Sequence, residues 1–197
     1  MRTAQWVLLT ALGLTAGVIT ALVLGRPIAA VVGMILVTPV LTAMVGLVLG
    51  ASQWLHMRRV LRGLGGWWVA ATCLGLGLGL AAGVVLVEQA GGALLGHPAR
   101  LLQLTLLPRA LSFAVIGAVS GWFLGFSQWL VLRRREPALR AWPWICAAAL
   151  AIGFPVSSLL VDLATGGIAS PAGLTIFLLS SGAILGASTA HRLRAIV

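Results

Sequence analysis

Six long stretches of the chain contain no Asp, Glu, Lys or Arg and consist mostly of apolar residues. They run from Thr3 to Gly25, Pro27 to Met57, Gly63 to Val87, Ala110 to Leu132, Ala141 to Val161 and Leu163 to His191. Each stretch is long enough for the ~20 residues that a helix needs to cross the hydrocarbon core of a bilayer. The pattern therefore predicts an all-α integral membrane protein with six transmembrane helices.

One motif occurs twice almost unchanged and a third time in altered form. It reads GLVLGASQWLHMRR from Gly46, GWFLGFSQWLVLRR from Gly121 and GAILGASTAHRLR from Gly182. In each copy, two glycines and a later polar residue share one face of a helix, and arginines follow. We expect the small residues to pack against other helices and the arginines to anchor the helix end at the membrane surface. The packing glycines are Gly46, Gly50, Gly121, Gly125, Gly182 and Gly186, the polar residues are Gln53, Gln128 and Thr189, and the anchors are Arg58, Arg59, Arg133 and Arg134.

The motif closes each of three helical hairpins, over 6–57, 67–134 and 142–194. A turn at 25–27 reverses the first hairpin, Pro39 kinks its second helix, and spans 4 and 6 begin at Leu111 and Ala172. Because the copies run parallel, we predict one domain over 1–197 with pseudo-threefold symmetry, in which the even-numbered spans pack through their Gly and Gln faces. Trp6, Trp68 and Trp144 precede the first motif glycine by 40, 53 and 38 residues. The middle unit thus holds extra residues, and we expect 97–107 to form a short helix at the outer interface.

Composition agrees with a bilayer protein, since 60% of the residues are hydrophobic and 8% are charged. The net charge of +10 comes from arginines scattered between apolar runs, without the clustering that nucleic acid requires. Most of these arginines fall at the termini and in the second and fourth connections, so the positive-inside rule places both termini in the cytoplasm. The first stretch fits the repeat, so we expect it to be a span and not a cleaved signal peptide.

Seven tryptophans fall at predicted cytoplasmic helix ends, as an aromatic belt would, and Trp122 sits deeper. The belt residues are Trp6, Trp54, Trp67, Trp68, Trp129, Trp142 and Trp144.

Gln53 and Gln128 admit two interpretations. Their amides can hydrogen-bond between helices, which we favour because they accompany packing glycines, or they can contact a substrate or pigment. The arginines that follow them can bind anionic lipid headgroups or an acidic loop of a partner, or serve topology alone.

Residues for chemistry are sparse. His56, His97 and His191 lack the spacing of a metal or haem site, and Cys73 and Cys146 lack the CxxC spacing of a redox pair. Glu88 and Asp162 lie at outer helix ends, where a carboxylate normally faces water, although the two could form a cation site. No charged residue falls at mid-membrane and no catalytic motif is present. We therefore expect no enzymatic activity, no metal and no cofactor.

The repeated GxxxGxSQWLxLRR segments, each followed by a Gly- and Ala-rich span, resemble a group of bacterial polytopic membrane proteins with no known activity. The resemblance implies the fold and an inner-membrane location and assigns no functional residue. The three-hairpin plan is also similar to that of the mitochondrial carriers, but the charged residues that follow the proline kinks of that family are missing.

Three functions remain open at this point. The first is a non-catalytic accessory subunit that packs against partner subunits in a larger membrane complex, respiratory or photosynthetic. The alternative is a small transporter or channel for an apolar or weakly polar solute, with Gln53, Gln128 and Thr189 at the cytoplasmic mouth of the pseudo-threefold axis. A third is lipid or pigment binding in grooves between hairpins, with Trp122 as a wall.

Overall fold

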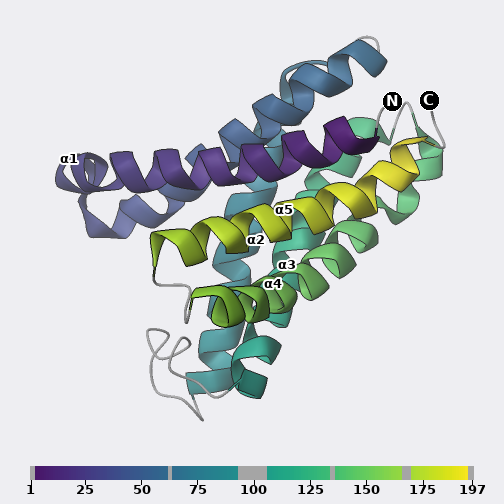
Figure 1. Cartoon of the computed structure of the whole chain (residues 1–197). Coiled ribbons are helices and arrows are strands. Elements are labelled where there is room, and N and C mark those ends of the chain that lie inside the picture. Colours follow the sequence, from purple (N-terminus) through teal and green to yellow (C-terminus); the bar gives the residue numbers. More distant parts are fainter. Residues whose placement is uncertain (1–2, 62–63, 93–105, 134–135, 166–169, 195–197) are drawn as a thin grey trace.

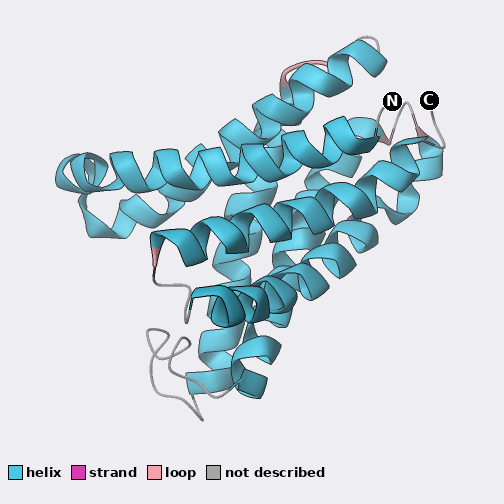
Figure 2. Cartoon of the chain, viewed as in Figure 1, coloured by secondary structure: helices cyan, strands magenta, loops and turns pink. Residues whose placement is uncertain are grey.

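The computed structural model describes residues 3–61, 64–92, 106–133, 136–165 and 170–194, without the side chains of 25–39, 60, 88, 91–92, 137–138 and 194. This part of the chain is helical and contains no strand (Figure 2). The elements are α1 (Thr3–Val60), α2 (Trp67–Gly92), α3 (Leu106–Leu132), the short 3-10 helix η2 (Pro137–Ala141), α4 (Trp142–Thr165) and α5 (Pro171–Arg194).

Six segments of these helices are long and apolar enough to cross a membrane, as the sequence predicted. They are Thr3–Leu24, Val40–Arg59, Trp67–Val87, Leu106–Leu132, Leu139–Thr165 and Pro171–Leu193. Large apolar side chains such as Leu12, Leu74, Leu78 and Ile152 are exposed on the outside of the molecule. Exposed apolar surface on this scale suits contact with lipid tails. The chain is therefore a multi-pass membrane protein.

Helix α1 contains two of the six spans and folds back on itself. The Ser52 hydroxyl donates to the carbonyl of Leu9 across 3.3 Å, whereas a straight helix would separate these residues by about 65 Å. The N-terminal part of α1 and its later part run back beside each other in Figure 1. The reversal falls between Leu24 and Val40, where one span ends and the next begins.

The expected turn at 25–27 is wrong in one respect, because the helical backbone continues through these residues. The kink was predicted at Pro39, which is one of the residues whose side chains lie outside the description.

Two other helix starts differ from the prediction. Helix α3 begins at Leu106 and includes Pro108, because a proline in the first helical turn removes no intrahelical hydrogen bond. The last two residues of the interfacial segment expected over 97–107 therefore belong to α3. Residues 97–105 lie outside the described residues. Helix α5 begins at Pro171, where the Ser170 hydroxyl accepts from the backbone N–H of Gly173 at 2.9 Å as an N-cap.

The spans form a closed ring in chain order. Each span packs on the next, and α5 returns to the N-terminal half of α1 (Figure 1). At the closing contact, a Cβ atom on Gly182 would lie 2.6 Å from the Cα of Ala11. The two termini lie at the same end of the molecule.

Candidate functional site

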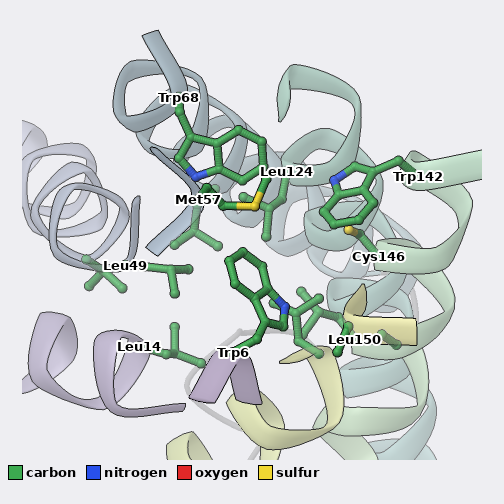
Figure 3. Close-up of a cluster of buried hydrophobic side chains, with 14 of the residues drawn as sticks. Trp6, Leu14, Leu49, Met57, Trp68, Leu124, Trp142, Cys146 and Leu150 are labelled. Atoms are coloured by element: carbon green, nitrogen blue, oxygen red, sulfur yellow. The ribbon is translucent and has the colours of Figure 1, made fainter. Parts of the chain in front are cut away.

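Three tryptophans meet at the centre of the ring, near the end of the molecule that carries both termini. Trp6, Trp68 and Trp142 stand at or near the start of α1, α2 and α4, and their indole rings turn toward one another (Figure 3). Their exposed fractions are 0%, 0% and 1%. The expected aromatic belt is therefore wrong for these three residues, although Trp67 and Trp144 are exposed. A buried indole N–H needs an acceptor, and polar residues of the neighbouring spans supply two of the three.

The acceptors are the polar residues of the repeated motif. Trp6 Nε1 donates to Thr189 Oγ1 at 2.9 Å, and Trp142 Nε1 donates to Gln128 Oε1 at 3.0 Å. The N–H of Trp68 has no hydrogen-bond partner among the described residues. Two of the three buried indole N–H groups therefore donate to a polar residue of the repeated motif.

Gln128 joins four spans. Its Nε2 donates to Gln53 Oε1 at 3.2 Å and to Thr72 Oγ1 at 3.1 Å, while its Oε1 accepts from the Trp142 indole. Gln53 Nε2 in turn lies 3.4 Å from Thr10 Oγ1. We call these side chains the polar centre: Trp6, Thr10, Gln53, Trp68, Thr72, Gln128, Trp142 and Thr189.

Apolar layers close the polar centre on both sides. One helical turn before its polar residues stand Leu49, Leu124 and Leu185, and one turn after them stand Met57, Leu132 and Leu193. All six side chains are buried. With water kept out, a hydrogen bond in the polar centre is stronger and an unpaired polar group costs more.

The motif glycines face the backbone of the next span. A Cβ atom on Gly46 would lie 2.6 Å from the Cα of Cys73, and one on Gly121 would lie 2.6 Å from the carbonyl carbon of Cys146. The second glycines make the same kind of approach: Gly50 to Val69, Gly125 to Pro143 and Gly186 to Val7. The glycine faces of the even-numbered spans therefore pack on odd-numbered spans.

The motif arginines stand above tryptophans of the same helices. The Arg58 guanidinium lies 4.8 Å from the ring centroid of Trp54, and the Arg133 guanidinium lies 5.7 Å from that of Trp129. Arg58, Arg59 and Arg133 are exposed. Arg134 lies outside the described residues.

Other candidate residues are dispersed. The His56 ring packs 6.1 Å from the Trp6 ring, His191 is exposed, and His97 lies outside the described residues. Asp162 forms an ion pair with Arg109 that joins the C-terminal end of α4 to the N-terminal end of α3, a contact that sequence reasoning missed because the two residues are 53 positions apart. The side chain of Glu88 lies outside the described residues. Within the described part of the chain, no group of three or more His, Cys, Asp or Glu side chains could hold a metal ion.

An apolar groove of about 360 Å³ lies between α2, α3 and α4 and opens on the outside of the ring. Trp122 is one of its walls, and Trp144 stands beside it with the two ring centroids 6.5 Å apart. The groove is lined by Ala82, Leu86, Ala118, Val119, Trp122, Phe123, Trp144 and Ala147.

Comparison of the chain with protein-family models, curated proteins and solved structures finds no match.

Proposed function

We propose that the chain is a non-catalytic structural subunit of a larger bacterial inner-membrane complex, respiratory or photosynthetic, which it joins through its lipid-facing surface. The observation that carries the proposal is that the polar residues inside the ring are hydrogen-bonded to one another. Gln53, Gln128 and Thr189 are all bound to other side chains of the ring, and apolar layers enclose them on both sides. A rigid, closed core of this kind suits a protein that acts through its outer surface.

Within this proposal the domain consists of three parallel two-helix repeats around a pseudo-threefold axis. The recurring contacts support it, because Trp6, Trp68 and Trp142 are equally buried and Gly46, Gly121 and Gly182 approach the next span alike. Trp142, and not Trp144, is therefore the residue of the third unit that corresponds to Trp6. It lies 40 residues before Gly182, the separation that Trp6 has from Gly46, so the middle unit carries an insertion of 13 residues.

The proposed orientation has both termini in the cytoplasm. Arg58, Arg59, Arg133 and Arg192 are exposed at the helix ends nearest the termini, where the positive-inside rule favours cationic side chains. The ion pair between Arg109 and Asp162 neutralises charge at the opposite end. An outer surface of low net charge is consistent with that orientation.

The packing of the glycines narrows where partners bind. The space in front of Gly46, Gly121 and Gly182 is filled by other spans of the same chain, so these glycines are not open to another subunit. Partner subunits would instead meet the exposed leucines and aromatic residues on the outside of the ring.

Transport along the axis is less well supported. A pathway needs polar side chains that face an open space, whereas Gln53 and Gln128 have exposed fractions of 3% and 2%. Leu49, Leu124 and Leu185 close the ring on the far side of these amides.

The test is purification of the tagged chain from its native membrane in a mild detergent, followed by mass spectrometry and an absorption spectrum. The same tag on an unrelated six-span protein of that membrane is the control. We expect a defined set of further subunits in constant ratio to the chain and absent from the control. A particle that contains this chain alone would overturn the proposal and direct attention to solute flux.

A further inference from the structure

A row of half-buried aromatic rings leads along α3 from the helix end that carries Arg133 to the apolar groove. Trp122, Phe126, Trp129 and Arg133 follow one another at helical spacing on one face. The rings of Trp122 and Phe126 are stacked with centroids 5.0 Å apart, and those of Phe126 and Trp129 are 5.8 Å apart. Arg133 covers the last ring at 5.7 Å. We call these four residues the aromatic strip.

The strip has the length of one lipid tail. Arg133 and Trp122 are 11 residues apart, which corresponds to about 16 Å along a helix. One leaflet contributes about 15 Å to the hydrocarbon core of a bilayer. A lipid whose headgroup meets Arg133 therefore brings the end of its acyl chain to Trp122 and the groove beside it.

Charge selects the headgroup. Arg133 is exposed, and no ion pair joins it to an acidic side chain within the described residues. The connection that begins there, RRREPALR, carries four arginines and one glutamate. A cationic helix end of this kind attracts an anionic phospholipid more strongly than a zwitterionic one.

The geometry points to a binding site for one anionic phospholipid, with its phosphate on Arg133, its acyl chain along the aromatic strip and the chain end in the groove between α2, α3 and α4. Alanines of three helices, Ala82, Ala118 and Ala147, leave the space that the chain end fills. This inference does not rest on the proposed subunit role, because the isolated chain contains the whole site.

The first motif copy provides a matched control. Arg58 lies over Trp54 at 4.8 Å, as Arg133 lies over Trp129. The positions that correspond to Phe126 and Trp122 are Ala51 and Leu47 in that copy, so its arginine has no aromatic strip below it. A substitution of Arg58 removes the same charge and the same cation–π contact without touching the site.

The experiment is native mass spectrometry of the purified full chain after delipidation and titration with dioleoyl phosphatidylglycerol or dioleoyl phosphatidylcholine. We expect one tightly bound phosphatidylglycerol on the unmodified chain and on Arg58→Gln. Arg133→Gln should bind it at least tenfold more weakly. Ala118→Phe, which fills the groove, should also lose it, and its unfolding temperature in detergent checks that the variant folds.

Three results would overturn the inference. Equal binding of phosphatidylcholine would remove the role of charge. Equal weakening by Arg58→Gln and Arg133→Gln would show that the arginines attract lipid without a defined site. A co-purified quinone or carotenoid that Ala118→Phe displaces would identify a different occupant of the groove. The titration uses the chain alone, so its outcome does not depend on whether partner subunits are found in the native membrane. The two proposals can therefore fail separately.

Discussion

Substitution of Gly121 by alanine tests the close contact between α3 and α4. The added Cβ atom would lie 2.6 Å from the carbonyl carbon of Cys146 and 2.8 Å from the Cα of Ala147. Both neighbours are backbone atoms, so no side-chain rotation relieves the overlap. To reach an ordinary contact of 3.4 Å, the two helices must separate by about 0.8 Å or more. Overpacking of this kind costs ~1–3 kcal/mol.

Two other glycines give matched controls. A Cβ atom on Gly77 would meet nothing within 4 Å, and one on Gly153 would meet Ile184 at 3.5 Å, an ordinary contact. Alanine at an open helical position gains up to ~1 kcal/mol from helix propensity. We therefore expect Gly77→Ala to be neutral or stabilising and Gly153→Ala to change stability little, whereas Gly121→Ala destabilises.

The assay is reversible unfolding in mixed micelles of mild detergent and sodium dodecyl sulfate, followed by tryptophan fluorescence. The free energy of unfolding should fall by ~1–3 kcal/mol for Gly121→Ala and should not fall for Gly77→Ala. Equal stability of Gly121→Ala and the unmodified chain would refute the reasoning, because the helices could not then be in backbone contact at this position.

Three further predictions use the same assay. Gln128→Leu should lower the free energy of unfolding by ~1–3 kcal/mol for each partner that it leaves unpaired, and a neutral effect would contradict the hydrogen-bond network. Trp6→Phe should destabilise more than Trp68→Phe, because both variants lose similar volume but only the first loses a hydrogen bond; the reverse order would exclude that pairing. Asp162→Arg should destabilise, and adding Arg109→Asp should restore much of the loss; a double variant no better than the single one would show that the ion pair does not form.

The spans were predictable because their signal is local. A run of about 20 apolar residues must be helical in lipid whatever its neighbours are. The reversal of α1 was predicted because this helix contains two such runs, and the chain must turn back between them. The helical backbone through 25–27 was not predicted. The start of α3 at Leu106 was missed because Pro108 and Arg109 resemble a connection until Arg109 is known to pair with Asp162.

The site was harder to predict. A tryptophan at a helix end can face the membrane interface or the interior, and the two cases have the same place in the sequence. The adjacent residues Trp67 and Trp68 illustrate this, with exposed fractions of 78% and 0%. The spacing along the chain could have identified the buried tryptophan of the third unit, since Trp142, and not Trp144, repeats the separation of Trp6 from its motif glycine.

The partners of Gln128 depend on helix order around the ring. Thr72 and Trp142 come from the two neighbouring helices, α2 and α4. A single sequence shows that an amide near a helix end is able to bond across helices, and it does not show to which helix.

The most direct test of the closed core uses the two native cysteines. Cys146 is buried one turn after Trp142 beside the polar centre (Figure 3), whereas Cys73 is half-buried. The folded chain in mild detergent is treated with methyl methanethiosulfonate, and each cysteine is followed by mass spectrometry, with the chain unfolded in sodium dodecyl sulfate as the reference. A closed core predicts that Cys146 stays unmodified over a time that modifies it completely in the unfolded chain. Modification of Cys146 in the folded chain at a rate close to the unfolded one would contradict the account and reopen the axis as a pathway.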